Sequence, residues 1–355
     1  MKFDFAIKKT DAPKARPDPE NLGFGKYYTD HMFMMEYKKD KGWHNGRIVP
    51  HGPICLDPAA SVFHYALEMF EGMKAFKAKD GRVLLFRPRM NARRMNITAD
   101  RLCLAEMDEE LFLSAVKAVV SFDKGWIPEA KGTSLYIRPF MIADEVYLGL
   151  RPSESFLFVI ILSPVGSYYK NGMKPTKLLV EDEYTRAAPG GTGYAKVGGN
   201  YAATVKAMIK AQALGCDQVL WLDGIEKKYV EEVGASNAFF VIGGEVITPA
   251  VGDTILKGVT RDSVITLLEK QGYKVTERNL SIEEIFSAGE LGKLDEAFAT
   301  GTAASISPIG ELVWKNRSIV IKNREIGQLS SKLYDELYGI QTGEAEDAFG
   351  WTEEV

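Results

Sequence analysis

The stretch that most constrains this chain reads Gly190-Gly191-Thr192-Gly193-Tyr194-Ala195-Lys196-Val197-Gly198-Gly199-Asn200-Tyr201. It places one lysine among five glycines, which allow the backbone to crowd around the lysine side chain. An amine attacks carbonyl groups only when it is partly deprotonated, and a desolvated or electropositive pocket produces that state. The stretch therefore makes Lys196 a candidate nucleophile toward a carbonyl group.

A second stretch, Glu231-Glu232-Val233-Gly234-Ala235-Ser236-Asn237, places Glu232 36 residues after Lys196. A carboxylate aimed at a pyridine nitrogen keeps that nitrogen protonated, and a protonated ring joined to a lysine accepts electrons from a substrate carbanion. We therefore interpret Lys196 and Glu232 as the two ends of a pyridoxal phosphate site.

The glycine run has alternative interpretations as a nucleotide-binding loop or a surface loop. A Walker phosphate loop requires Gly-x-x-x-x-Gly-Lys-Ser/Thr, but Ala195 precedes Lys196 and Val197 follows it. A dinucleotide fingerprint requires a third glycine where Lys196 stands. Both nucleotide-binding patterns fail, whereas a plain glycine-rich surface loop stays open on the residues alone.

Length and composition indicate an ordinary globular protein with one large or two average domains. The chain has 355 residues, 46% of them hydrophobic and 26% charged, with a net charge of -4. The sequence has no block of basic residues, so we do not expect it to bind nucleic acid. The longest apolar stretch, Ser155 to Ser163, is too short for a membrane span, and the acidic N-terminus carries no signal core. We expect a cytoplasmic location and no membrane partner.

Cysteine and histidine usage argues against disulfides and metals. The three cysteines are widely spaced and odd in number, which is typical of reduced thiols: Cys55, Cys103 and Cys216. The four histidines have no metal-ligand spacing: His31, His44, His51 and His64. The sequence predicts no metal site.

The first half of the chain alternates predicted strands and helices. Segments rich in aromatic and branched residues predict strands at 31–37, 73–77, 83–87, 134–142 and 156–162. Helices are predicted at 60–70, 89–102 and 109–122. Pro164 to Pro175 contains two prolines and two glycines, which favours a connection between domains.

The second half begins with a predicted strand at 177–181 and, after the lysine stretch, a helix from Asn200 to Leu214 that Gly215 ends. Short strands are predicted at 218–223, 228–232, 238–242 and 245–248, a series that suits a curled sheet or barrel. A helix at 260–271, a strand at 274–278 and a helix at 328–338 follow. The acidic residues after Gly343 are expected to form a surface tail.

Further motifs extend along nearly the whole chain: His64-Tyr-Ala-Leu-Glu-Met-Phe-Glu-Gly-Met-Lys-Ala-Phe76, Phe86-Arg-Pro88, Leu135-Tyr-Ile-Arg-Pro139, Gly198-Gly-Asn-Tyr201, Glu232-x-Gly234-x-x-Asn237-Ala-Phe239, Val246-x-Thr248 and Leu256-x-Gly258-Val259-x-Arg261. With these motifs the chain resembles the branched-chain amino acid aminotransferases of the fold-type IV pyridoxal phosphate enzymes. The resemblance implies a mixed α/β (α+β) fold. Its expected parts are a small α/β domain at 1–165, an interdomain loop at 166–176 and a larger domain with a β-barrel-like core at 177–355.

The resemblance also implies an activity and a cofactor site. The activity is transamination of L-leucine, L-isoleucine and L-valine with 2-oxoglutarate, and the cofactor is pyridoxal 5'-phosphate. Lys196 resembles the lysine that carries the cofactor, and Glu232, rather than its neighbour Glu231, resembles the partner of the pyridine nitrogen. The remaining cofactor contacts implied are Tyr201 to the phenolic oxygen, and Arg94, Val259, Thr260 and Thr302 to the phosphate.

On the substrate side, the resemblance implies a pocket with aromatic walls: Tyr65, Phe70, Tyr136, Arg138, Tyr168, Ala303 and Ala304. Arg138 and the tyrosine hydroxyls are expected to hold the distal carboxylate of glutamate and 2-oxoglutarate. The resemblance further implies a homodimer in which Tyr65 reaches the partner's pocket.

The chain departs from the family pattern at three positions. Ala304 and Ser307 stand where vertebrate relatives carry a Cys-x-x-Cys pair, so thiol-based redox control of that kind is not expected. Ala235 replaces a threonine of those relatives, which is expected to affect substrate preference rather than catalysis. The nearest alternatives are a D-amino acid aminotransferase or an aminodeoxychorismate lyase, and a nucleotide-binding protein is the alternative from another class.

Overall fold

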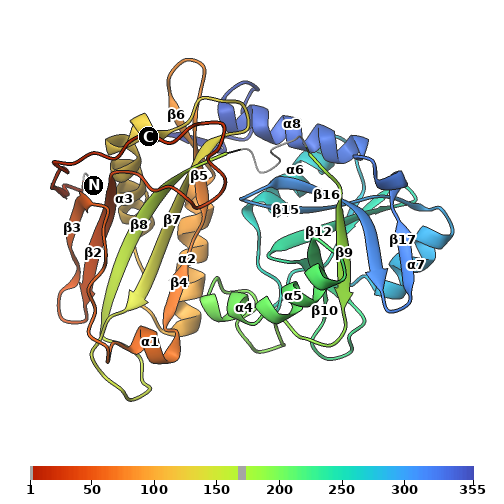
Figure 1. The fold of residues 1–355 in the computed structure, drawn as a ribbon, viewed down its shortest axis with the longest axis horizontal. Helices are drawn as coiled ribbons and strands as arrows, with labels where there is room; N and C mark the ends of the chain where they lie inside the picture. Colours follow the sequence, from red (N-terminus) through yellow and green to blue (C-terminus); the bar gives the residue numbers. More distant parts are fainter. Residues whose placement is uncertain (1–2, 167–172) are drawn as a thin grey trace. The chain divides into compact units, whose positions relative to one another are not determined.

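The computed structural model describes residues 3–166 and 173–355, and Figure 1 shows their arrangement within each part of the chain. The chain forms two compact units. Unit 1 contains Met1–Lys170, Lys196–Gly198 and Tyr338–Val355, and unit 2 contains Asn171–Ala195 and Gly199–Leu337. Lys196 is therefore grouped with the N-terminal part of the chain, although the residues up to Ala195 and from Gly199 onward belong to unit 2.

Unit 1 is built on a nine-stranded mixed sheet with the order β1-β3-β2-β8-β7-β5-β6-β18, in which β4 pairs with β7. The strands are β1 Ala6–Ile7, β2 His31–Lys38, β3 Gly42–Pro50, β4 Glu68–Phe70, β5 Met73–Lys77, β6 Val83–Phe86, β7 Ser134–Ala143, β8 Ser155–Val165 and β18 Thr352–Glu354. The central strand β8 is buried along nearly its whole length, as its continuous apolar sequence predicts.

The helices of unit 1 are α1 Ser61–Tyr65, α2 Pro88–Leu102 and α3 Glu109–Phe122. Pro88 begins α2, where its missing N–H costs no hydrogen bond. Asp108 caps α3 by accepting hydrogen bonds from the amides of Glu110 and Leu111. The apolar sides of α2 and α3 pack on the sheet and form its largest core, around residues such as Phe112 and Phe158. This packing fixes α2, which carries several residues of the site described below.

Unit 2 contains a closed barrel. Its strands are β9 Thr176–Glu181, β10 Gln218–Leu222, β11 Val230–Val233, β12 Ser236–Ile242, β13 Glu245–Thr248, β14 Val275–Glu277, β15 Leu294–Gly301, β16 Ser305–Trp314 and β17 Arg317–Val320. The order β11-β10-β9-β16-β15-β12 is closed by pairing of β12 with β11, which makes a six-stranded ring. The expected β-barrel-like core and mixed α/β fold are confirmed.

The helices of unit 2 surround the barrel. They are α4 Gly198–Ala202, α5 Val205–Ala213, α6 Val259–Lys270, α7 Ile282–Glu290 and α8 Gln328–Thr342, of which α4 begins and α8 ends in unit 1. Helix α5 contacts β9 and β10, α6 contacts β15, and α7 contacts β15 and β17. Across the residues that the structure describes, we find no helix with the length and apolar character needed to traverse a lipid bilayer.

Three expectations about local structure differ from the structure. The predicted helix at 60–70 ends at Tyr65, because Ala66 adopts a left-handed conformation with φ 49° and Glu68–Phe70 then pairs with β7 as a strand. The expected surface tail is partly folded, since Thr352–Glu354 pairs with β6 and the side chain of Trp351 packs against Phe86. The predicted helix at 200–214 is divided into α4 and α5.

Candidate functional site

The backbone of Lys196 is held by residues of unit 1 that are distant in sequence. The Lys196 N–H donates to the Thr98 hydroxyl at 3.0 Å, and its carbonyl accepts from the Phe70 N–H at 3.1 Å. Thr98 belongs to α2 and is fully buried, and Phe70 belongs to β4. A helix and a strand therefore fix the residue that the glycine-rich sequence leaves conformationally free.

The Lys196 amine lies in an electropositive and desolvated environment. Burial lowers the pKa of Lys196 to about 8, with a further contribution from the positive charges of Arg94 and Arg138, while Glu71 and Tyr136 oppose the shift. The amine nitrogen lies 4.7 Å from the centroid of the Phe70 ring. With a pKa near 8, roughly a tenth of the amine is neutral at pH 7, against well under a thousandth for an exposed lysine. A buried amine with a lowered pKa is suited to nucleophilic attack on a carbonyl group.

Arg94 is oriented by a buried carboxylate that the sequence reasoning did not single out. Its Nε and Nη2 donate to the two oxygens of Glu71, both at 2.8 Å, and Asn91 donates to the same carboxylate at 2.8 Å. Burial alone would raise the pKa of Glu71, but Arg94 and these hydrogen bonds hold it below its usual range. Glu71 stands inside the motif around Phe70 and Gly72, which is the signal from which it could have been found.

Arg138 and Tyr136 lie next to this cluster on β7. Arg138 donates to the Tyr136 hydroxyl at 3.0 Å, and its guanidinium lies 4.7 Å from the Phe70 ring centroid. The buried Nε of Arg138 has no hydrogen-bond partner among the described residues. The Tyr136 hydroxyl occupies the space above Gly72, where any Cβ would lie 2.2 Å away. Lys196 and Arg138 thus lie over one aromatic ring, and Arg94, whose charge lowers the pKa of Lys196, completes a cationic cluster.

Among the described residues, the predicted substrate residue Tyr65 has its contacts away from this cluster. Tyr65 ends α1, donates its hydroxyl to the carbonyl of Leu148 and is 37% exposed. Tyr168 falls outside the described residues. Tyr65 instead belongs to a group of exposed apolar side chains that we call the α1 patch: Phe63, Tyr65, Val146, Tyr147, Leu148 and Leu150.

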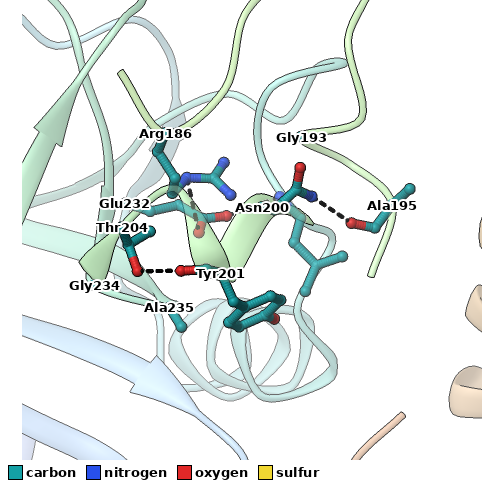
Figure 2. Close-up of a pocket in the computed structure, with 10 residues that line it drawn as sticks. Arg186, Gly193, Ala195, Asn200, Tyr201, Thr204, Glu232, Gly234 and Ala235 are labelled. Atoms are coloured by element: carbon teal, nitrogen blue, oxygen red, sulfur yellow. Dashed lines mark hydrogen bonds and ion pairs between the residues drawn. The ribbon is translucent and has the colours of Figure 1, made fainter. Parts of the chain in front are cut away.

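Glu232 lines a pocket within unit 2 (Figure 2), and its side chain is almost fully buried. One of its oxygens accepts from the Leu256 N–H at 2.8 Å, and the other lies 3.5 Å from Nε of Arg186. Tyr201 and Ala235 line the same pocket. The structure therefore brings Glu232 and Tyr201 together, and it adds Arg186, which the sequence reasoning did not identify.

The neighbouring Glu231 has a different environment. It lines a separate cavity of about 370 Å³ with Asp223, Tyr229 and Thr254. Burial raises the pKa of Glu231, and one carboxylate oxygen has no hydrogen-bond partner among the described residues. Because consecutive residues of a strand point to opposite faces, β11 presents only one of the two glutamates to the Tyr201 pocket.

Asn237 connects the strand of Glu232 to strand β15 and to the loop at Leu256. In the barrel register Asn237 lies opposite Glu232 on one side and Thr300 on the other. Its side-chain amide donates to the carbonyl of Leu256 at 2.9 Å, and a Cβ on Gly258 would lie 2.1 Å from its oxygen. The turn after Leu256 therefore packs closely on the strand that faces Glu232.

Three of the four predicted phosphate contacts, Val259, Thr260 and Thr302, lie in unit 2, whereas Arg94 lies on α2 of unit 1. Val259 and Thr260 form the buried first turn of α6, whose N-cap, Gly258, provides no side-chain hydrogen bond to the helix. Open amides at a helix start are suited to an anion. Thr302, Ala303 and Ala304 form the half-buried turn between β15 and β16, directly after Thr300. One end of the barrel thus carries Glu232, the α6 turn and the Thr302 turn.

Comparisons with known proteins agree with this geometry. Residues 68–312 match the family described as Amino-transferase class IV. The chain is 54% identical over 349 residues to branched-chain-amino-acid aminotransferase 2 of Bacillus subtilis (strain 168), covering 98% of this chain and 96% of that protein. It is 45% identical over 336 residues to the branched-chain-amino-acid aminotransferase of Mycolicibacterium smegmatis, covering 93% of this chain and 91% of that protein.

Solved structures of similar fold carry related names. The branched-chain amino acid aminotransferase of Escherichia coli superposes with a TM-score of 0.77 at 26% identity, covering 91% of this chain and 98% of that one. The branched-chain aminotransferase of the archaeon Thermoproteus uzoniensis, solved with norvaline, has a TM-score of 0.76 at 25% identity. This match covers 91% of the present chain and 99% of that chain. A third branched-chain amino acid aminotransferase, solved as a complex with N-(5'-phosphopyridoxyl)-L-glutamate, has a TM-score of 0.73 at 26% identity. This match covers 91% of the present chain and 97% of that chain.

Proposed function

Because the chain belongs to the class IV aminotransferases, we propose that Lys196 is the residue that carries its cofactor and moves the reacting proton. The reaction is transamination of branched-chain amino acids with pyridoxal 5'-phosphate, in which 2-oxoglutarate takes up the amino group. The observation that carries the assignment is the buried amine of Lys196, whose pKa is lowered to about 8. A partly neutral amine in an otherwise cationic cluster is suited to attack the cofactor's carbonyl.

The residues present fit the cofactor. Glu232 offers a buried carboxylate to a pyridine nitrogen, and Arg186 beside it favours the charged form of that carboxylate. Tyr201 lines the same pocket and offers a hydroxyl to the phenolic oxygen. The open first turn of α6, with Val259 and Thr260, offers amides to the phosphate, and we assign Arg94 and Thr302 to the same group.

Each side chain has a defined role in the proposed mechanism. Bound pyridoxal phosphate supplies an electron sink for the negative charge that develops on the substrate Cα. With the cofactor bound, Lys196 would take the proton from the substrate Cα on its Nζ and would then donate it, so it would serve as both base and acid. Glu232 holds a proton at the pyridine nitrogen throughout the reaction.

The substrate side chain is proposed to lie against Phe70 and Tyr136, with Ala303 and Ala304 at the barrel end. Burial of the three carbons that leucine has beyond alanine is worth about 2 kcal/mol, a preference of about thirtyfold. For glutamate and 2-oxoglutarate we propose that Arg138 and the Tyr136 hydroxyl bind the distal carboxylate. The glutamate adduct named in the third of the solved relatives supports a site that accepts both side-chain types.

A substrate panel tests the proposed function. Purified protein is supplied with pyridoxal phosphate and 2-oxoglutarate, and glutamate formation is measured with L- and D-forms of leucine, isoleucine, valine and alanine. We expect L-leucine and L-isoleucine to exceed L-alanine by about thirtyfold in kcat/KM, L-valine, which has two carbons beyond alanine, to exceed it by about tenfold, and the D-forms to be inactive. Preference for D-amino acids would indicate the D-specific alternative, and pyruvate release from aminodeoxychorismate would indicate the lyase.

The assembly that we propose is a homodimer in which Tyr65 reaches the partner's pocket. The α1 patch supports it, because contiguous exposed apolar side chains mark interaction surfaces. The patch is held together by the Tyr65 hydroxyl on Leu148 and by a backbone bridge from Ala60 to Val146. A cytoplasmic location is also proposed, in keeping with the three free cysteines.

Subunit mixing tests the role of Tyr65. Lys196→Ala and Tyr65→Ala proteins are each expected to be inactive, but their heterodimer contains one site with both residues intact. After random exchange about half of the dimers are mixed and half of their sites are complete, so we expect about a quarter of the parent activity. Each variant exchanged with itself is the control. An inactive mixture after verified exchange, or an active isolated monomer, contradicts the shared site.

A further inference from the structure

Glu68 is a half-buried carboxylate close to the cationic cluster, and the reaction as described above gives it no task. It lies on β4 and pairs in register with Ile142 of β7. Because side chains alternate along a strand, Glu68 and Phe70 lie on the same face of β4. Phe70 on that face contacts both the Lys196 amine and the Arg138 guanidinium. Glu68 therefore shares a surface with the two groups to which we assign chemistry.

Glu68 makes a direct contact with the lysine stretch. Its Oε1 accepts a hydrogen bond from the Gly198 N–H, two residues after Lys196. The approach is so close that a Cβ on Gly198 would lie 2.2 Å from this oxygen. Together with Thr98 of α2 and Phe70 of β4, Glu68 thus makes a third hydrogen bond to the backbone of residues 196–198. An acceptor at this position helps to fix where the Lys196 side chain begins.

Glu68 also interacts electrostatically with Arg138. Burial raises the pKa of Glu68, while the Gly198 N–H and the positive charge of Arg138 oppose the shift. The interaction is reciprocal, so the negative charge of Glu68 offsets part of the Arg138 charge. A substrate whose distal carboxylate binds Arg138 must displace the interaction between Glu68 and Arg138, and it also brings a second negative charge close to Glu68. The aliphatic side chain of a branched-chain substrate has neither of these energetic costs.

We propose that Glu68 is a specificity-determining residue, which positions the lysine stretch through Gly198 and weakens the binding of dicarboxylate substrates at Arg138 relative to branched aliphatic ones. This inference rests on the proposed function, in which Arg138 holds the distal carboxylate. The expected consequence is that Glu68 lowers the affinity of the enzyme for 2-oxoglutarate and glutamate. Its selectivity for leucine, isoleucine and valine is thereby increased.

The test separates the charge of Glu68 from its hydrogen bond. Glu68→Gln keeps an oxygen for the Gly198 N–H but removes the charge, and Glu68→Ala removes both. For Glu68→Gln we expect kcat/KM for 2-oxoglutarate to rise roughly five- to tenfold, mainly through KM, with the leucine value within about twofold of the parent. For Glu68→Ala we expect kcat to fall in both half-reactions. Glu154→Gln, which removes an exposed carboxylate paired with Lys39, is the matched control.

A double-mutant cycle tests the route through Arg138. Arg138→Met is expected to lower kcat/KM for 2-oxoglutarate at least tenfold and to affect leucine less. Adding Glu68→Gln to Arg138→Met is expected to have no further effect on 2-oxoglutarate. The inference is overturned if Glu68→Gln leaves the ratio of the two specificity constants unchanged, or if its effect persists undiminished without Arg138. Failure of the proposed function is distinguishable, because the parent protein itself would then show no turnover with leucine and 2-oxoglutarate.

Discussion

Replacement of Lys196 by alanine is expected to lower kcat for leucine and 2-oxoglutarate by about a thousandfold or more and to leave the fold intact. The proposed mechanism uses the amine twice, to carry the cofactor and to move the Cα proton, and proton transfer alone contributes up to about 10⁴-fold. Burial makes the charged form of the Lys196 amine unfavourable, as its pKa of about 8 indicates. Removal of the amine should therefore not destabilise the folded protein. Steady-state kinetics and thermal unfolding measure the two quantities.

The matched control for this variant is Lys206→Ala, which removes an exposed lysine of α5. It is expected to keep parent activity. A second readout does not depend on turnover: borohydride treatment should fix the cofactor covalently to the parent and to Lys206→Ala but not to Lys196→Ala. Substantial multiple-turnover activity of folded Lys196→Ala, without added amine, would show that another residue carries the cofactor.

Replacement of Glu232 by glutamine is expected to lower kcat about 100-fold, whereas Glu231→Gln should stay within a few-fold of the parent. Only a charged partner holds a proton on the pyridine nitrogen, and the loss of two pKa units at that nitrogen corresponds to about 2.7 kcal/mol. Glu232 lines the Tyr201 pocket beside Arg186, and Glu231 lines a different cavity. The paired variants therefore remove one buried carboxylate each from neighbouring positions of the same strand.

The pH dependence of the bound cofactor's absorbance distinguishes a lost proton from a damaged pocket. Glu232→Gln is expected to shift this titration relative to the parent, and Glu231→Gln is expected to leave it unchanged. Equal rates and equal titrations for the two variants would mean either that Glu231 is the functional carboxylate or that the charge of the ring has no effect on turnover.

Elements whose signals are local agree well with their predicted positions. Helix α3 covers Glu109–Phe122 as predicted, because its cap, Asp108, and its apolar periodicity both lie within the segment itself. The failed prediction for 60–70 has a different origin. Glu68–Phe70 becomes a strand because β7 offers it hydrogen-bonding partners about seventy residues away, which no local propensity reports. The pairing of Thr352–Glu354 with β6 is equally remote in sequence.

The sequence by itself determined the membership of the family and predicted Lys196 and Glu232 as site residues, because the family's motifs depend on residue types at fixed spacings along the chain. Only the tertiary structure decided which groups surround them. Glu71 on Arg94, Arg186 beside Glu232, and Glu68 on Gly198 are contacts between segments 23, 46 and 130 residues apart. The physical reason is that burial and charge neighbours set the pKa and orientation of a side chain, and both quantities arise only when distant segments pack together.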